Sequence, residues 1–358
     1  MRSLLILTIF FSLISSNVFA QSVAMADGLR KEFKGKLDVW TLSLRAATTR
    51  EAQQKLWDER PDGDEYAKKI WSNLRGSLEQ EGSLDTASWL LKLVRSLPVE
   101  DVSPEKQEFR TEIVQQVSAV VEKQHLRSPR LASMCMGLVA VGDMRSMKLL
   151  ERIEKENPDR TVQGVAALGV AMLLESLSDD VRTMKRRLNL IRKAIIESAH
   201  VEIDGVTIAK LADDQLYVIR YLTKGREAPD LKGVDVSGNP LSLSDLKGKV
   251  VVLVFWNTAM DDFARFLDIH QKLTKNMEGK NFALIGVTND SATTLRVLQA
   301  NGSLPWRNIC DTNSTLAKQY RVQSRPFAYV LDQNRVIQYM GNPGSFAELT
   351  ADALMLNP

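Results

Sequence analysis

The sequence predicts two successive domains: an all-α bundle or short α-solenoid, then an α/β domain with a mixed central sheet covered by helices on both faces. Two observations lead to this prediction. Between residues 21 and 222, apolar residues return every three or four positions, which is the period of an amphipathic helix. After residue 226, short valine-rich runs alternate with helical stretches, which is typical of buried strands between helices. We therefore expect a helical domain over 21–222 and an α/β domain over 226–358.

Composition indicates an ordinary folded protein and argues against two classes of partner. Of the 358 residues, 44% are hydrophobic and 25% are charged, which is the balance of a soluble globular protein. The 47 basic and 44 acidic residues leave a formal charge of only +3. This balance provides no large field that would hold nucleic acid or an anionic membrane surface. Partners must therefore be predicted from local sites.

Residues 1–20 have the pattern of a secretory signal peptide. Arg2 supplies the positive charge, Leu4–Leu13 the apolar run, and Val18–Ala20 a small-residue cleavage site. The apolar run is shorter than the ~20 residues needed to cross a bilayer, so a membrane anchor is the less favoured alternative. No cysteine stands near the cleavage site to receive a lipid. We expect a soluble periplasmic or secreted protein with no integral membrane segment after cleavage.

Start signals divide the helical domain into elements. Ser103–Pro104 combines a capping serine with proline at the first helical position, and Ser128–Pro129 repeats that signal. Before these two Ser-Pro signals, an apolar stripe over Trp89–Leu97 predicts another helix. Further helices are expected at Met144–Lys155, Thr161–Leu174, Val181–Ser198 and Ile208–Leu222. No clean repeat of about 34 residues is present, so a tetratricopeptide array is not predicted.

The helix expected over Val181–Ser198 carries a basic group. Its members are Lys185, Arg186, Arg187, Arg192 and Lys193. One interpretation is a docking patch for an acidic partner, and the other is a solvated helix face. The second is favoured, because Leu188, Ile191 and Ile195 supply the apolar stripe that would be buried behind such a face.

The α/β domain is predicted from short elements in a fixed order. Val250–Phe255 and Phe282–Val287 are apolar runs expected to form central strands. A hairpin turn at Asp332–Asn334 separates two later strands. The remaining expected elements are helices at 263–273, 293–300 and 345–354 and strands at 327–331 and 336–339.

Four segments of this domain carry a family resemblance. They are Ala228–Asp230, Leu241–Lys249, Phe255–Trp256 and Arg325–Phe327. In this order the chain resembles the redoxin family, in particular the TlpA-like thiol-disulfide oxidoreductases and the AhpC/TSA peroxiredoxin group. The resemblance covers residues 226–358 and implies a thioredoxin-like fold. The whole layout is also similar to exported bacterial redoxin-domain proteins with a helical part before the redoxin domain.

The segment that carries the chemistry in that family is altered here. Active members open the helix after this strand with Trp-Cys-x-x-Cys, where the positive helix end stabilises a thiolate. Met260 and Phe263 stand at the two cysteine positions. The peroxidatic cysteine of a peroxiredoxin would also fall near Met260. Neither a thioether nor a phenyl ring can exchange disulfides, so we predict no catalytic residue at this place.

The rest of the family's groove is retained in sequence. Pro326 corresponds to the family's cis-proline, which leaves the backbone of the preceding residue open to an extended peptide. Arg325 would point toward Asp261 and Asp262, either closing the groove with an ion pair or offering a charged contact to a ligand. The predicted binding groove therefore consists of Trp256, Asp261, Asp262, Arg325 and Pro326.

The chain has two cysteines, Cys135 and Cys310. Cys135 lies in an apolar run and is expected to be buried and inert. The resemblance places Cys310 in a short strand before a helix at 314–320, away from the activating helix start, although it could be a relocated nucleophile. A Cys135–Cys310 bridge is permitted by an oxidising compartment but is not favoured.

The three histidines have no cysteine or carboxylate at metal-ligand spacing. We expect neither a metal nor another cofactor.

Two functions remain open at this point. The first is a redox-inactive binding or scaffold module for an exported protein or peptide partner. The second is a thiol-disulfide oxidoreductase or a peroxiredoxin-type antioxidant enzyme that uses Cys310 or a cysteine on a partner chain. The sequence leaves the oligomeric state open.

Overall fold

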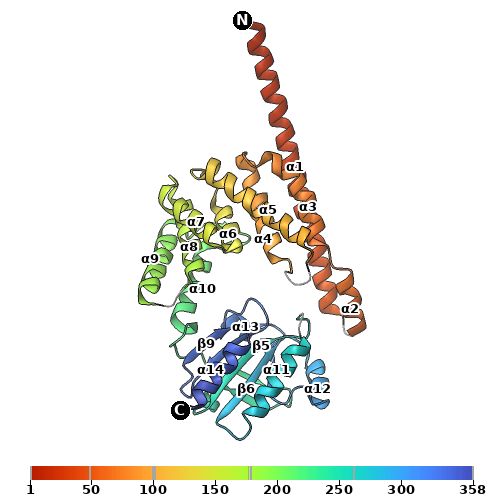
Figure 1. Ribbon diagram of the computed structural model, residues 1–358, viewed down its shortest axis with the longest axis vertical. Coiled ribbons are helices and arrows are strands. Elements are labelled where there is room, and N and C mark those ends of the chain that lie inside the picture. Colours follow the sequence, from red (N-terminus) through yellow and green to blue (C-terminus); the bar gives the residue numbers. More distant parts are fainter. Residues whose placement is uncertain are drawn as a thin grey trace. The chain divides into compact units, whose positions relative to one another are not determined.

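The computed structural model describes residues 2–47, 50–98, 102–175, 177, 180–260 and 263–356. The chain divides into two compact units, Met1–Ala212 and Asp213–Pro358 (Figure 1). Each unit has its own packing.

The first unit is built from helices and one small hairpin. Its helices are α1 (Arg2–Ala46), α2 (Arg50–Asp58), α3 (Gly63–Leu74), α4 (Leu84–Ser96), α5 (Pro104–Val120), α6 (Ala132–Val141), α7 (Met144–Glu156), α8 (Arg160–Leu174), α9 (Val181–Ser198) and the start of α10 (Ile208–Tyr217). Short helical turns are η1 (Arg75–Ser77), η2 (Glu81–Ser83) and η3 (Val121–His125), and the hairpin is β1 (Glu202–Ile203) with β2 (Val206–Thr207). Within the described part of the chain, no helix combines the length and apolar character needed to cross a bilayer.

Side chains that accept hydrogen bonds from backbone N–H groups cap the starts of these helices. Ser103 accepts from the N–H of Lys106 at the start of α5, as its Ser-Pro signal predicted. The second Ser-Pro signal does not start a helix, because the Ser128 hydroxyl accepts from the N–H of Arg130 in a turn and α6 begins only at Ala132. Aspartates cap α3, α7, α8 and α9 in the same way as Ser103.

The unit's packing centres on α8, which contacts α6, α7 and α9. Small residues on α8 let the α9 backbone come close: a Cβ on Gly164 would lie 2.0 Å from the Ser198 hydroxyl. This close approach buries one narrow face of α9 against α8.

The buried face of α9 differs from the expected one. Ile191 is buried as predicted, but Leu188 and Ile195 are each 38% exposed. The fully buried neighbour of Ile191 is Arg187, whose guanidinium lies 3.3 Å from the Glu175 carboxylate. The prediction of a Leu188–Ile191–Ile195 stripe was therefore wrong in two of its three members, because an ion pair replaces the apolar contact.

The second unit continues from α10 into an α/β sandwich. Its elements are η4 (Val218–Leu222), β3 (Lys232–Val234), β4 (Pro240–Ser242), η5 (Leu243–Leu246), β5 (Val250–Trp256), α11 (Phe263–Asn276), β6 (Phe282–Thr288), α12 (Ala292–Ala300), β7 (Arg307–Cys310), α13 (Thr315–Gln319), β8 (Phe327–Leu331), β9 (Ile337–Gly341) and α14 (Ser345–Leu356). The main sheet has the order β7-β6-β5-β8-β9. Strands β5, β6 and β7 are parallel, and β8 and β9 are antiparallel to their neighbours.

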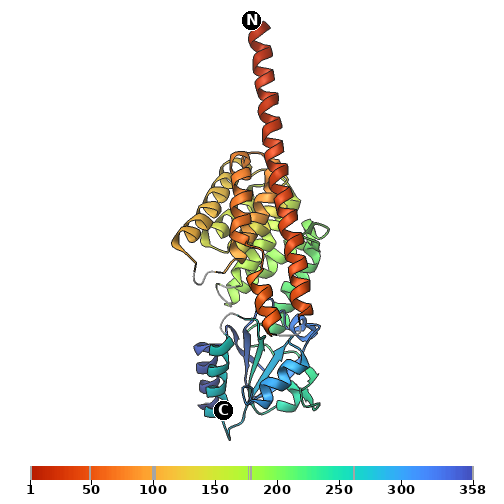
Figure 2. The same cartoon turned by 90° about the vertical axis from the view of Figure 1, so that its right-hand side faces the viewer.

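Strand β5 is buried on both faces, which explains its unbroken apolar run. Val251, Leu253 and Phe255 pack in one core cluster with α13 and the segment around β4. Val250, Val252, Val254 and Trp256 pack in the other with α11 and α14. Figure 1 shows α11 and α14 in front of the strands, and Figure 2 shows the sheet from the side.

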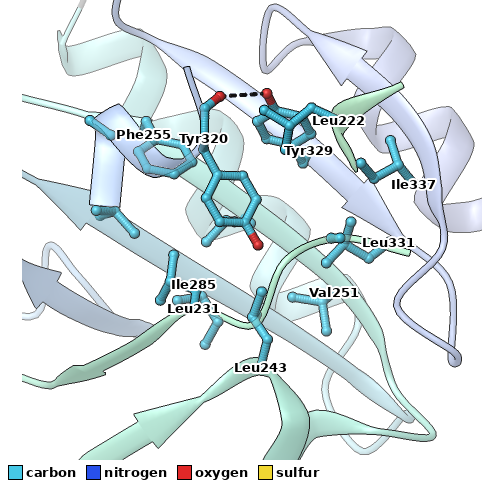
Figure 3. Close-up of a cluster of buried hydrophobic side chains, with 14 of the residues drawn as sticks. Leu222, Leu231, Leu243, Val251, Phe255, Ile285, Tyr320, Tyr329, Leu331 and Ile337 are labelled. Carbon is cyan, nitrogen blue, oxygen red and sulfur yellow. Dashed lines mark hydrogen bonds between the residues drawn. The ribbon is translucent and has the colours of Figure 1, made fainter. Parts of the chain in front are cut away.

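Aromatic side chains organise the first of these two clusters. Tyr320 and Tyr329 cross edge to face, with ring centroids 5.3 Å apart, and both rings contact Phe255 (Figure 3). The Tyr329 hydroxyl donates to the Tyr320 carbonyl over 2.9 Å, so a buried polar group is satisfied within the cluster.

This architecture confirms the predicted fold class, a helical first part followed by a mixed sheet with helices on both faces. The strands and helices expected over 250–354 are all present, with ends shifted by at most a few residues. Two short hairpins, β1–β2 and β3–β4, were not predicted.

Candidate functional site

Three parallel strands end together at one edge of the main sheet. Trp256 of β5, Thr288 of β6 and Cys310 of β7 are aligned side by side in the register. Because the carboxyl ends of parallel strands share one edge, the loops that follow them converge there. This edge contains most of the predicted groove.

Asp290 connects the loops at this edge. Its carboxylate accepts from the Thr258 backbone N–H at 2.8 Å, from the Thr258 hydroxyl at 3.0 Å and from the Thr288 hydroxyl at 2.9 Å. Its carbonyl accepts from the Cys310 thiol at 3.1 Å. A single half-buried aspartate thus holds the loop after β5 against the loop after β6.

Trp256 lies behind the site. It is fully buried, and its indole N–H donates to the Asn308 amide oxygen at 3.2 Å. Trp306 donates to the same oxygen at 3.1 Å. Gly286 leaves room for this arrangement, since a Cβ there would lie 1.9 Å from that oxygen. Trp256, predicted as part of the groove, therefore supports its floor from inside the core.

Packed side chains occupy the two positions where the resemblance implies a dithiol. The Phe263 ring stacks on the Trp256 indole, with centroids 5.7 Å apart and an interplanar angle of 12°. Met260 and Phe263 are both partly buried against the core cluster around Trp256 and Phe266. These side chains extend the core to the place where a reactive thiol would need access.

The Arg325–Pro326 peptide bond is cis, as the resemblance implied for Pro326. It directly precedes β8, whose Phe327 pairs with Phe255 one residue before the end of β5. In the described part of the chain, the backbone N–H and C=O of Arg325 have no hydrogen-bond partner. This backbone is therefore available beside the end of β5.

The Arg325 side chain is half-buried and incompletely paired. Its Nε and Nη2 atoms are shielded from solvent and have no hydrogen-bond partner among the residues described. Burial lowers the pKa of the guanidinium below its usual range, and the nearby Asp311 and Asp290 carboxylates oppose that shift. Asp261 and Asp262, the predicted partners of Arg325, lie outside the described residues.

Cys310 lies at the end of β7, in the strand that the resemblance implied. Burial raises the pKa of its thiol above the usual range, and the Asp290 and Asp311 carboxylates raise it further against a backbone hydrogen bond from Thr312. The group is therefore a poor nucleophile at neutral pH. Cys135 is fully buried on α6, where burial raises its pKa to about 12. Both are free thiols.

Known proteins match this second unit. Residues 224–340 match the model of the AhpC/TSA family. The chain is 32% identical over 121 residues to thioredoxin-like protein YneN of Bacillus subtilis, covering 33% of this chain and 70% of that protein. The chain is a thioredoxin-like redoxin of the AhpC/TSA family.

Two further proteins are similar to this redoxin. It is 29% identical over 137 residues to chloroplastic peroxiredoxin Q of Sedum lineare, covering 35% of this chain and 72% of that protein. A solved thiol-disulfide oxidoreductase from Bacteroides fragilis aligns with a TM-score of 0.33 and 25% identity, covering 37% of this redoxin and 99% of that chain. The family match begins at residue 224, so the helical unit lies outside it.

Three residues that shape the redoxin's site were not predicted, namely Thr258, Asp290 and Asn308. For Thr258 and Asp290 the available signal was their position, because each is a polar residue just beyond the carboxyl end of a parallel strand, whereas Asn308 is the second residue of β7. The pairing of Thr258 with Asp290 and of Asn308 with Trp256 depends on strand order, which the spacing of residues does not contain.

Proposed function

We propose that this redoxin is a redox-inactive, exported binding module that holds an extended peptide at the carboxyl edge of its parallel strands. One observation carries the proposal. Among the described residues, the backbone of Arg325 and two of its guanidinium nitrogens have no hydrogen-bond partner, and Arg325 lies at the edge where Met260 and Phe263 fill the expected thiol positions.

Two observations support the loss of thiol chemistry, one at Met260 and Phe263 and the other at Cys310. Met260 and Phe263 contain no ionisable sulfur and pack against Trp256 and Phe266. Cys310 is held as a neutral thiol by burial and by two neighbouring carboxylates. Disulfide exchange needs a thiolate, so neither place provides its reacting atom at neutral pH.

Peptide binding is supported by the groups that remain unpaired. A free backbone N–H and C=O can pair with an extended chain as one strand of a ladder pairs with the next. A desolvated guanidinium gains free energy from a carboxylate or carbonyl oxygen that satisfies its N–H groups. An extended peptide that carries an acidic group provides both.

Insulin disulfide reduction by the full chain tests the loss of chemistry. We expect no activity above background in the wild type. The double variant Met260→Cys with Phe263→Cys should reduce insulin, because it restores two thiols at the helix start. Activity in the wild type that disappears in Cys310→Ser would contradict the proposal.

Fluorescence anisotropy with labelled, S-carboxymethylated insulin B chain tests the binding. Arg325→Gln should weaken binding about tenfold, since a charge-assisted hydrogen bond contributes about 1.5 kcal/mol. Arg226→Gln is the matched control, because Arg226 is an exposed arginine in the same unit. Equal affinities for the two variants would refute a role for Arg325.

A thiol-based enzyme is the second candidate. The observation in its favour is the half-buried Cys310 at the same sheet edge as Trp256. In this case Cys310, or a cysteine on a partner chain, would supply the nucleophile that Met260 cannot. The insulin assay with Cys310→Ser separates the two candidates.

A further inference from the structure

Helix α9 of the helical unit exposes an apolar face. Val181 is 86% exposed and Ile196 is 75% exposed, and the half-covered Leu188 and Ile195 lie between them. Single exposed apolar residues are ordinary, but these four lie on one side of α9, within about 100° of one another around the helix axis. This surface, which we call the α9 face, lies beside the buried side formed by Arg187, Ile191, Ala194 and Ser198, about a third of a turn around the helix.

The order of residues on the α9 face has the spacing of a helix–helix contact. Apolar residues recur every seven positions at Val181, Leu188 and Ile195, and cations stand between them at Lys185 and Arg192. The steps alternate between four and three residues, as they do along the seam of a coiled coil. The two cations are two turns apart, about 10 Å along the axis.

The cations of the α9 face have no acidic partners among the residues that the structure describes. Arg186 and Lys193, which lie to the side of it, pair with Glu151 and Glu154 of α7. Arg187 pairs with Glu175 in the core. In the described ranges, no carboxylate comes within ion-pair distance of Lys185 or Arg192. The face therefore combines apolar surface with uncompensated positive charge.

This pattern selects among possible occupants. A helix that lies on a membrane keeps its centre apolar and its cations at the flanks, whereas Lys185 and Arg192 lie in the middle of the α9 face. A second copy of the chain would bring like charges into the same seam, which is unfavourable. A helix with carboxylates between its apolar residues would complement both the apolar surface and the positive charge of the α9 face.

We propose that the α9 face docks an acidic amphipathic helix of a partner protein, with carboxylates placed against Lys185 and Arg192 and apolar residues placed against Val181, Leu188 and Ile195. The site is independent of the redoxin groove. Through this site, the helical unit would recruit a protein partner.

Two synthetic helical peptides of about 20 residues test the proposal on the full chain. The first carries leucine and glutamate alternately along a heptad seam, and the second has lysine in place of each glutamate. Fluorescence anisotropy should show the glutamate peptide binding about tenfold more tightly than the lysine peptide. The double variant Lys185→Glu with Arg192→Glu should reverse this preference.

The control is Lys148→Glu with Lys155→Glu, which makes the same charge change at the same spacing on α7. It should keep the wild-type preference, which shows that net charge is not the cause. Binding of neither peptide, or equal binding of both, would overturn the proposal.

Two further measurements identify other occupants. Sedimentation of phosphatidylglycerol-containing vesicles with the wild type but not with the double variant, together with no peptide preference, would assign the face to lipid. A wild-type dimer that dissociates in Leu188→Glu would assign it to a second copy. Either result would replace the acidic helix as the occupant.

Discussion

Gly286 is the position where one added side-chain carbon should most disturb the hydrogen bonds that lie behind the site. A Cβ there would lie 1.9 Å from the Asn308 amide oxygen and 2.6 Å from the Trp256 indole nitrogen. Gly286→Ala should therefore displace the shared hydrogen bonds of Trp256 and Asn308 and lower the unfolding free energy by about 3 kcal/mol. Urea denaturation followed by tryptophan fluorescence measures this change.

Gly344→Ala is the control in the same unit, since no atom lies within 4 Å of a Cβ there. It should change stability by less than about 1 kcal/mol. If the two alanine variants unfold at the same urea concentration, the close packing at Gly286 does not stabilise the unit.

The Cys310 thiol should be slow to alkylate at neutral pH. Its pKa is raised, so the reactive thiolate is scarce below the ordinary cysteine pKa and increases as pH rises through the shifted value. With Cys135→Ser as background, iodoacetamide should react about tenfold more slowly than with free cysteine at pH 7.4. Mass spectrometry over a pH series measures the rate.

Cys310→Ser in the same background serves as the blank. Rapid alkylation of Cys310 at pH 7.4, with no further rise toward pH 9, would mean that the thiol is activated. That result would favour the thiol-based enzyme.

At the scale of elements, a buried ion pair joins α3 to α5. The Arg110 guanidinium donates two hydrogen bonds of 2.8 Å to the Asp64 carboxylate, and these hold the pKa of Asp64 below its usual range. A lowered folded-state pKa stabilises the fold above the unfolded-state value and loses that effect as pH falls through it. The contribution is therefore complete at neutral pH and declines below about pH 4.

Asp64→Asn should lower the unfolding free energy at pH 7 by about 3 kcal/mol, because it leaves Arg110 buried without its counter-ion. Thermal unfolding from pH 7 to pH 3 should also show a flatter acid dependence in this variant. Asp268→Asn, which breaks the exposed Lys272 pair, should change stability by less than about 1 kcal/mol. Similar losses in both variants would contradict the buried pair's larger role.

At the scale of the whole molecule, two compact units serve different expected roles. The redoxin unit contains the family match, whereas the helical unit carries the α9 face. A signal peptide would export the two units together, because they belong to one chain.

Expression in a bacterium with a secretion pathway should yield a mature chain that begins at Gln21. Val18 and Ala20 both precede the expected cleavage point, and Ala20→Arg should block cleavage because a signal peptidase needs a small residue there. Intact-mass spectrometry of the periplasmic fraction distinguishes the two forms. An uncleaved wild type would contradict the predicted signal.

The elements of the second unit could be predicted because each depends on local pattern. Val250–Trp256 is an unbroken apolar run, and such a run needs cover on both faces wherever it sits. The residues at the positions where the resemblance implies two cysteines, Met260 and Phe263, can likewise be read from the sequence without any structure.

The burial of α9 could not be predicted in the same way. Periodicity identified the helix over Val181–Ser198 with its correct ends, but it chose Leu188 and Ile195 for the inside. Arg187 went inside because Glu175 pairs with it there, and its partner lies at the end of a different helix. A hydropathy pattern contains no information about such a partner.

By itself, the sequence determined that a helical part is followed by a redoxin part, because helix period, strand runs and residue identity are local properties. It also placed Met260 and Phe263 where the resemblance implies thiols. Only the tertiary structure decided that Asp290 joins two loops, that Trp256 supports the groove from the core and that the α9 face is open. Each of these depends on which distant residues come into contact, and strand order and helix packing set those contacts.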